Sequence, residues 1–339
     1  MRGVGHAPTL IADEQVEPVA AFLLARAGSL GKAPCAVPGK PGTDTALSTL
    51  AGLPYNSPMN TRTLNIDLHC HSTVSDGALA PRDVAQRAHA NGVDVWALTD
   101  HDEVGGLVEA ASAARELGMA FATGVEISVT WAGLTVHIVG LRFDPENTVL
   151  VDGLRKTRAG RAERAKRIGE RLADMGMPGA YEGALPFAGN PELISRTHFA
   201  RYLVQAGYCP DVQTVFNKHL GDDRPGHVPM QWATLAEAVG WIRGAGGLAV
   251  IAHPGRYKYT PLQFAALFDE FLQLGGVGIE VNTGSHTAEE ARQYADVARR
   301  YGFLASRGSD FHSPKESRMD LGRLPALPSD LKPVWHDWF

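Results

Sequence analysis

Residues 66–77 read IDLHCHSTVSDG and place His69 and His71 on either side of Cys70. The apolar residues at the start of this stretch predict a β-strand, in which successive side chains point to opposite faces. The two histidines therefore share one face, and Cys70 lies on the other. We expect the histidines to bind a metal and Cys70 to pack as a small apolar side chain.

Downstream of this stretch, short β-prone runs alternate with helix-like segments. The runs are LNIDLH (64–69), VDVWALTD (93–100), MAFATGVEI (119–127), LTVHIVGL (134–141), GLAVIAH (247–253), GVGIEVN (276–282) and FLASRGSD (303–310). Alternation of this kind predicts parallel strands joined by crossover helices, as in an open α/β sheet or a β/α barrel. The fold class is therefore α/β.

Two regions depart from this alternation. Residues 1–62 are rich in Ala, Gly and Pro, and we expect a flexible N-terminal extension with one short helix near 17–27. The remaining domain spans 63–339 and contains an α-helical insertion at about 145–246. The first helix of that insertion has eight Lys and Arg against two Glu between Arg155 and Arg171. It is either a solvated face or an attractor for a polyanionic substrate.

The bulk composition of the 339-residue chain narrows the class of protein. The net charge is −5, and no apolar run approaches the roughly 20 residues that a membrane span needs. Three scattered cysteines argue against a disulfide framework and favour a reducing compartment. We therefore expect a cytoplasmic protein with no membrane association and no obligate protein partner.

Nearly every predicted strand ends in His, Asp or Glu, and in parallel α/β folds these ends form the site. The predicted metal ligands are His69, His71, Asp76, His101, Glu126, His137, His253, Asp310 and His312. Catalytic roles are expected for His69, His71, Glu126, His253 and Asp310. Substrate contacts are expected from Asp102, Arg196, His198, Arg201 and Arg256. Asp102 is also a candidate for orienting a ligand, and the role of Glu280 stays open.

Imidazoles and carboxylates without thiolates suit Mn, Fe, Zn or Co. The nine candidates exceed what one tetrahedral ion needs, so we expect two or three ions about 3.5–4 Å apart with Glu126 as a bridge. Such a cluster would hold a hydroxide that attacks a phosphorus atom in line. The sequence contains neither a Gly-x-Ser-x-Gly elbow nor a Walker loop that would favour a different chemistry.

Six separated motifs occur in a fixed order: DLHCHSTVSDG, ALTDHD, GVEIS, HIVGL, AHPGRY and GSDFH. Together they resemble the PHP (polymerase and histidinol phosphatase) superfamily over about residues 64–325. The resemblance implies a distorted (β/α)7 barrel with two or three divalent metal ions, Mn foremost. It implies three ligand sets: His69, His71, Glu126 and Asp310; Glu126 and His253 with His137; and Asp76, His101 and His312.

The helical insertion, which includes SRTHFARYLV (195–204), is similar to one branch of that superfamily. This branch contains nucleoside 3′,5′-bisphosphate phosphatases and 5′-to-3′ exoribonucleases of the RNase AM type. The resemblance implies hydrolysis of the 3′-phosphate of nucleoside 3′,5′-bisphosphates, or stepwise cleavage of short 5′-phosphorylated RNA. The alternatives are a histidinol-phosphate phosphatase and a metal-binding module without turnover.

Overall fold

The computed structural model describes residues 64–339. The expectations for residues 1–62 lie outside these described residues. Seven strands form one sheet in chain order. They are β1 (Ile66–Asp67), β2 (Val95–Leu98), β3 (Ala120–Trp131), β4 (Leu134–Leu141), β5 (Leu248–Ile251), β6 (Gly278–Thr283) and β7 (Leu304–Gly308).

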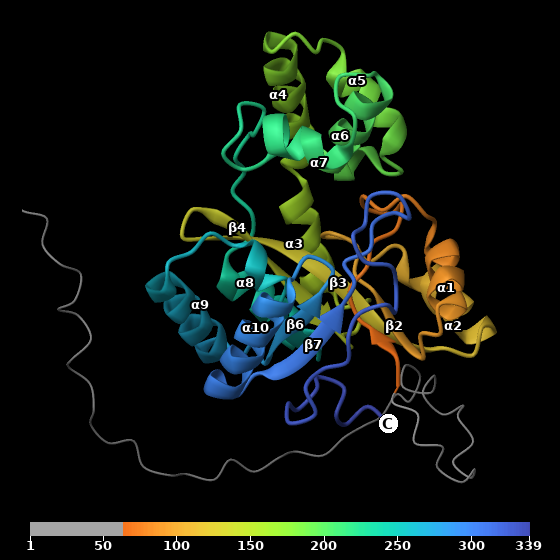
Figure 1. Ribbon diagram of the computed structural model, residues 1–339, viewed down its shortest axis with the longest axis vertical. Helices are drawn as coiled ribbons and strands as arrows, with labels where there is room; N and C mark the ends of the chain where they lie inside the picture. The colour runs from red at the N-terminus through yellow and green to blue at the C-terminus, as the bar shows by residue number, and fades with distance from the viewer. Residues whose placement is uncertain (1–63) are drawn as a thin grey trace, which may run out of the picture. The chain divides into compact units, whose positions relative to one another are not determined.

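The two outer strands of this sheet, β1 and β7, approach one another. The backbone N–H of Leu68 donates to the carbonyl of Arg307 at 3.1 Å, and that of Asp310 donates to the carbonyl of His69 at 2.7 Å. These bonds nearly close the sheet into a barrel of seven strands (Figure 1). The predicted α/β class and distorted barrel are thereby confirmed.

The direction of β4 differs from the expected parallel arrangement. It pairs antiparallel with both β3 and β5, whereas the other neighbouring strands pair in parallel. Only Ala132 and Gly133 separate β3 from β4, and their φ values of 46° and 80° are those of a tight hairpin turn. A two-residue connection leaves no room for a crossover helix, so the strand must reverse.

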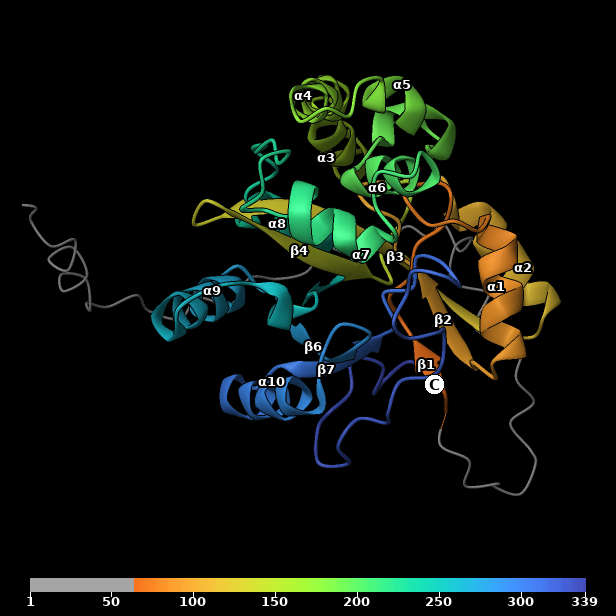
Figure 2. The same ribbon diagram turned by 45° about the horizontal axis from the view of Figure 1, so that its top comes forward.

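Helices pack along the outside of the barrel in both views (Figures 1 and 2). They are α1 (Pro81–Ala90), α2 (Leu107–Glu116), α3 (Thr148–Arg158), α8 (Leu235–Gly244), α9 (Pro261–Gln273) and α10 (Ala288–Tyr301). Threonines cap α8, α9 and α10 in reciprocal capping boxes, which satisfy backbone N–H groups at the helix starts. Helix α3 lies tightly against α8, since a Cβ at Gly153 would meet the Trp241 ring at 2.5 Å.

Residues 159–233, which we call the cap, rise above one end of the barrel (Figure 1). The cap contains α4 (Arg161–Asp174), α5 (Ala180–Ala184), α6 (Arg196–Gln205), α7 (Val212–Val215) and the short turns η3 (Leu185–Phe187), η4 (Pro191–Leu193) and η5 (Phe216–Leu220). It has an apolar core of its own that includes Ile168, Leu172, Phe199 and Leu203. The cap is thus a packed unit and not an extended loop.

Cys70 packs as the alternation of side chains along the strand predicted. Its thiol donates to the carbonyl of Ala97 at 3.3 Å and accepts from Nε1 of Trp96 at 3.1 Å. These contacts place the sulfur within the buried layer between strands and helices. Within residues 64–339 no helix has the length and apolar character needed to cross a membrane.

Candidate metal centre

The nine predicted metal ligands come together in four overlapping groups at one edge of the barrel. The groups are His71, Asp76, His101 and His312; His69, Glu126 and His253; His69, His71 and Asp310; and His101, Glu126 and His137. Most follow the carboxyl ends of β1, β2, β5 and β7, as parallel strands require. His137 instead lies in the first half of β4, because the reversed strand begins at this edge.

One ligand atom from each of His69, His71, Glu126 and Asp310 lies close to the others. Nε2 of His71 lies 3.3 Å from Nε2 of His69, from Oε2 of Glu126 and from Oδ1 of Asp310. Nε2 of His69 lies 3.4 Å from that Glu126 oxygen and 3.6 Å from that Asp310 oxygen. Ligands about 2.1 Å from a tetrahedral ion are separated by about 3.4 Å. Five of the six separations within this set are therefore close to those of ligands around one metal ion.

Glu126 faces two sets of histidines with its two oxygens. Oε1 lies 2.8 Å from Nδ1 of His137 and 2.8 Å from Nε2 of His253. Oε2 faces His69 and His71, and it also lies 2.9 Å from Nδ1 of His101. A carboxylate in this position can bridge two ions.

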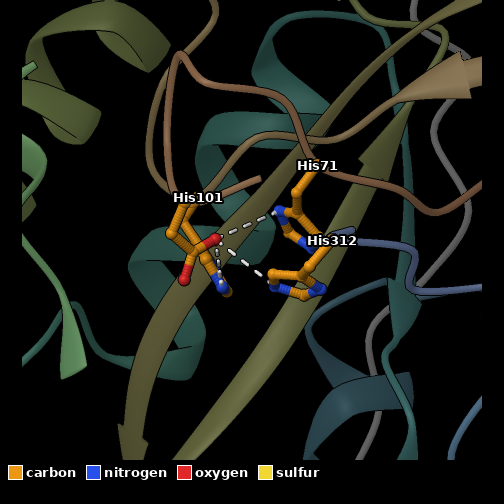
Figure 3. Close-up of side chains that lie close together, drawn as sticks. His71, His101 and His312 are labelled. Atoms are coloured by element: carbon orange, nitrogen blue, oxygen red, sulfur yellow. Dashed lines mark ion pairs between the residues drawn. The ribbon is translucent and has the colours of Figure 1, made fainter. Parts of the chain in front are cut away.

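Three histidines converge on the carboxylate of Asp76 (Figure 3). Its Oδ1 lies 3.3 Å from His312, 3.9 Å from His101 and 4.0 Å from His71. The rings of His71 and His312 stack with their centroids 4.1 Å apart. This group shares His71 with the set that also includes His69 and Asp310, so the two groups are contiguous.

Several oxygens of the cluster are buried without a hydrogen-bond donor. They are Oδ1 of Asp76, Oε2 of Glu126 and Oδ1 of Asp310. A buried carboxylate oxygen that lacks a donor is costly unless a cation neutralises it. The orphaned oxygens and the mixed imidazole–carboxylate donor set thus fit one or more divalent metal ions.

The electrostatics of the cluster agree with this fit. Burial opposes ionisation of the carboxyls, yet the histidines around Glu126 and Asp76 hold their pKa values well below the ordinary range. Burial, reinforced by Arg256, lowers the pKa of His253 to about 3, which keeps its ring in the neutral form that binds metals. His71 shows the opposite effect: against the effect of burial, Asp310 and Glu126 raise its pKa to about 10. The carboxylates therefore attract a positive charge that a metal ion would supply.

Three residues at this edge have strained backbones. The φ values are 51° at Asp102, 25° at His253 and 53° at Asp310. Non-glycine residues rarely adopt positive φ, and such strain concentrates at functional sites. At His253 and Asp310 it accompanies the exit of the chain from β5 and β7 toward the cluster.

Glu280 on β6 supports two of the predicted ligands. Its Oε1 lies 2.8 Å from Nδ1 of His69, and its Oε2 accepts the backbone N–H of His253 at 2.7 Å. With Nδ1 of His69 as a donor to this carboxylate, Nε2 is left free for a metal. In the sequence, the only indication of this role was the position of Glu280 in the run GVGIEVN. That position does not distinguish a residue that orients a ligand from a purely structural one.

Glu280→Gln is expected to lower the metal affinity of the protein by about 10–100-fold. A glutamine offers one oxygen and one amide, so either His69 or the N–H of His253 meets an amide donor. If the amide faces His69, Nδ1 must accept and Nε2 carries the proton, which removes it as a ligand. Metal titration of wild type and variant measures the effect, and equal affinities would contradict the orienting role.

The cap contributes a second support through the start of α6. The hydroxyls of Ser195 and Thr197 donate to Oδ2 of Asp76 at 3.2 and 2.9 Å. On the barrel side, Asp100 accepts from the backbone N–H and hydroxyl of Ser72 at 2.8 and 2.6 Å. These contacts join segments far apart in the sequence, so no local pattern could reveal them.

All five predicted substrate contacts stay predictions, and for three of them the structure shows partners within the protein. Asp102 is fully buried; it accepts from the N–H of Ser128 at 2.7 Å and forms an ion pair with Arg161. It therefore joins the barrel to the cap and presents no surface to a substrate. The sequence did not show that Arg161 would occupy its carboxylate.

His198 and Arg201 likewise bond to other residues of the protein, but Nε2 of His198 is buried without a hydrogen-bond partner. His198 is fully buried, and its Nδ1 accepts the N–H of Ser195 at 2.9 Å at the start of α6. Arg201 forms a two-pronged ion pair with Glu316 at 2.9 and 2.7 Å, which ties the cap to the loop after His312.

The other two predicted contacts have side chains with more exposed surface. Arg196 pairs with Asp222 at 2.6 Å, and its side chain is partly exposed. Arg256 pairs with Asp310, a predicted ligand, and 46% of its side chain is exposed. Arg256 is thus placed beside the cluster with surface left for a substrate.

Comparisons with known proteins agree with this geometry. Residues 67–284 match the PHP domain. A 3′,5′-nucleoside bisphosphate phosphatase from Chromobacterium violaceum is 50% identical over 80% of this chain and 96% of its own length. A 5′-3′ exoribonuclease from Haemophilus influenzae is 41% identical over 80% of this chain and 98% of its own length.

A solved structure has a similar fold. It is described as an amidohydrolase from Chromobacterium violaceum with bound sulfate and no metal, and it is 50% identical to this chain. It superposes with a TM-score of 0.78 and covers 80% of this chain and 95% of that one. With its barrel, its six ordered motifs and its cluster of His, Asp and Glu, the chain belongs to the PHP family.

Proposed function

We propose that the protein is a metal-dependent phosphoric ester hydrolase that removes the 3′-phosphate of nucleoside 3′,5′-bisphosphates. The same site would act as a 5′-to-3′ exoribonuclease on short 5′-phosphorylated RNA. The observation that carries the proposal is Glu126, whose two oxygens face different histidines within one continuous cluster. The similarity to relatives named for these two activities supports the choice of substrates.

The nine residues at the barrel edge would hold two or three divalent ions, with Mn as our first choice among Mn, Fe, Zn and Co. His69, His71, Glu126 and Asp310 would hold one ion, and Glu126, His137 and His253 another. Asp76, His101 and His312, with His71, would hold a third. Bound ions supply an activated water and neutralise charge on the phosphoryl group.

The side chains of the protein have separate tasks in this reaction. Glu280 fixes the tautomer of His69, and the hydroxyls of α6 fix Asp76. Arg256 is partly exposed beside Asp310 and would orient the phosphoryl group by donating hydrogen bonds to its oxygens. The cap stands over this edge and would limit access of bulk water.

One site can serve both substrates because the bond that breaks is equivalent. In a bisphosphate the phosphorus on O3′ is a terminal phosphate, and in RNA it links to the next nucleotide. Attack on that phosphorus releases inorganic phosphate from the first and a 5′-mononucleotide from the second. The bound sulfate of the solved relative supports binding of a tetrahedral oxyanion.

A cytoplasmic location stays a prediction.

A substrate panel with the full-length chain and added Mn tests the proposal. We expect phosphate release from a nucleoside 3′,5′-bisphosphate and 5′-mononucleotides from short 5′-phosphorylated RNA. His71→Ala is the control: it should abolish turnover while the fold is retained. Turnover of histidinol phosphate alone would place the enzyme in the alternative pathway. Loss of folding in the control would favour a structural role for the metal.

A further inference from the structure

His286 lies in the connection between β6 and α10, and both of its ring nitrogens have partners. Nδ1 lies 2.9 Å from the carbonyl oxygen of Val281, which can only accept, so the proton of the neutral ring is on Nδ1. Nε2 is left as an acceptor and takes the backbone N–H of Gly255 at 3.0 Å. Burial lowers the pKa of His286, which favours this neutral form. His286 belongs to none of the four ligand groups, so its ring has a task other than metal binding.

The ring of His286 lies in a fixed plane against the backbone of Gly255. It stacks on Tyr294 of α10, with the ring centroids 5.0 Å apart and the planes inclined by 21°. A Cβ at Gly255 would meet Cδ2 of His286 at 2.8 Å and Nε2 at 3.0 Å, so the close approach requires glycine. The hydrogen bond therefore depends on a glycine on one side and on a ring of fixed orientation on the other.

Gly255 lies in the middle of the turn from His253 to Tyr257, which follows β5. The turn begins with the strained backbone of His253, where φ is 25°, and strain of this kind persists only where the surroundings hold it. The hydroxyl of Tyr257 holds the end of the turn by donating to the carbonyl of Ala252 at 2.8 Å. The imidazole of His286 holds the middle. The turn is thus supported at two points, one of which comes from a different strand connection.

We propose that His286 is a positioning residue that fixes this turn through Gly255 and so keeps Arg256 beside the metal centre. The proposal rests on the proposed function, in which Arg256 orients the phosphoryl group. Arg256 forms an ion pair with Asp310, and 46% of its side chain is exposed. Because this side chain is long and partly exposed, the direction of its guanidinium group depends on a backbone that other residues hold in place.

The predicted metal ligand of the same turn has supports of its own. Glu280 accepts the backbone N–H of His253 at 2.7 Å, and Oε1 of Glu126 lies 2.8 Å from its Nε2. Loss of the imidazole should therefore displace Arg256 more than His253. This difference separates a role of His286 in orienting the phosphoryl group from a role in holding metal.

Two variants separate the hydrogen bond of His286 from the packing of its ring. His286→Phe keeps a ring against Tyr294 and loses the acceptor, whereas His286→Gln has an amide oxygen near the place of Nε2. Hydrogen–deuterium exchange of the metal-free full chain measures the peptide over 252–258. It should exchange faster in His286→Phe than in wild type, and His286→Gln should restore part of the protection. His89→Phe, at an exposed position of α1, is the matched control and should behave as wild type.

A double-mutant cycle with Arg256 tests the consequence for the reaction. In the Mn-loaded full chain, His286→Phe should lower kcat/KM for a nucleoside 3′,5′-bisphosphate by about tenfold, with the bound metal unchanged. His286→Gln should lose less. In the Arg256→Gln background the change to Phe should cost less than about twofold, because the group that His286 positions is then absent.

Three results would overturn the proposal: unchanged exchange in His286→Phe, equal losses of kcat/KM in both backgrounds, or loss of bound metal in His286→Phe. If wild type hydrolyses no bisphosphate, the proposed function fails, and the exchange comparison still decides whether His286 holds the turn. If His286→Phe does not fold, Gly255→Ala carries both comparisons, because its Cβ would displace the ring and break the same hydrogen bond.

Discussion

We expect Glu126→Gln to lower kcat/KM by about a thousandfold, the largest effect of any single isosteric change in this protein. Glu126 is fully buried, and both of its oxygens face imidazole nitrogens at 2.8–3.4 Å. A glutamine keeps the shape but turns one oxygen into an amide donor and removes the negative charge. One of the two sets of histidines then loses the carboxylate that it shares with the other, so the side chain would no longer be able to bridge the proposed pair of ions.

Metal content and kcat/KM, measured on the same preparation, check this result. The variant should retain less metal than wild type and should unfold at a similar temperature in the presence of a chelator. Glu170→Gln, which removes an exposed carboxylate of α4, is the matched control and should leave both quantities unchanged. Full metal content together with near-wild-type turnover would show that Glu126 is not a bridging ligand.

The second large effect is on stability. Arg161→Met is expected to lower the free energy of unfolding by about 3–5 kcal/mol, because it leaves Asp102 buried without its cation. Arg161 is 5% exposed and Asp102 is fully buried, so water cannot replace the lost partner. The double variant Asp102→Leu with Arg161→Met should recover part of the loss, since both charges are then gone.

Denaturant unfolding of the full chain measures this change, with separate probes for cap and barrel because two units need not unfold together. Arg292→Met provides the contrast. Its ion pair with Glu289 is exposed on α10, and such pairs contribute about 0–1 kcal/mol. A loss at Arg161 as small as that at Arg292 would show that the pair does not hold the cap to the barrel.

Most of the barrel was predictable because its signal is local. Five of the strands are short apolar runs between amphipathic helices, namely β1, β2, β5, β6 and β7. This alternation alone predicts parallel pairing. The reversal of β4 was missed, although its signal was present. Ala132 and Gly133 are too short a connection for a crossover, and a strand that follows after two residues must run antiparallel.

The candidate metal ligands could be proposed from the sequence for a similar reason. HxH on one strand face and acidic or histidine residues at successive strand ends need only the topology to bring them together. The residues that hold these ligands in place could not be predicted from the sequence, because their roles depend on where the cap packs against the barrel. Asp102 reads as a strand-end carboxylate until Arg161, fifty-nine positions later, is seen to occupy it.

The reversal of β4 also determines where the cap could arise. β4 runs away from the metal centre, so α3 must carry the chain back and ends where Arg158 donates to the carbonyl of Asp102. Helix α8 then returns beside α3, with Trp241 against Gly153. Departure and return therefore share one face of the barrel. This geometry permits exchange of the whole segment without rethreading the strands, and the nine candidate ligands, which all lie outside the cap, would stay in place.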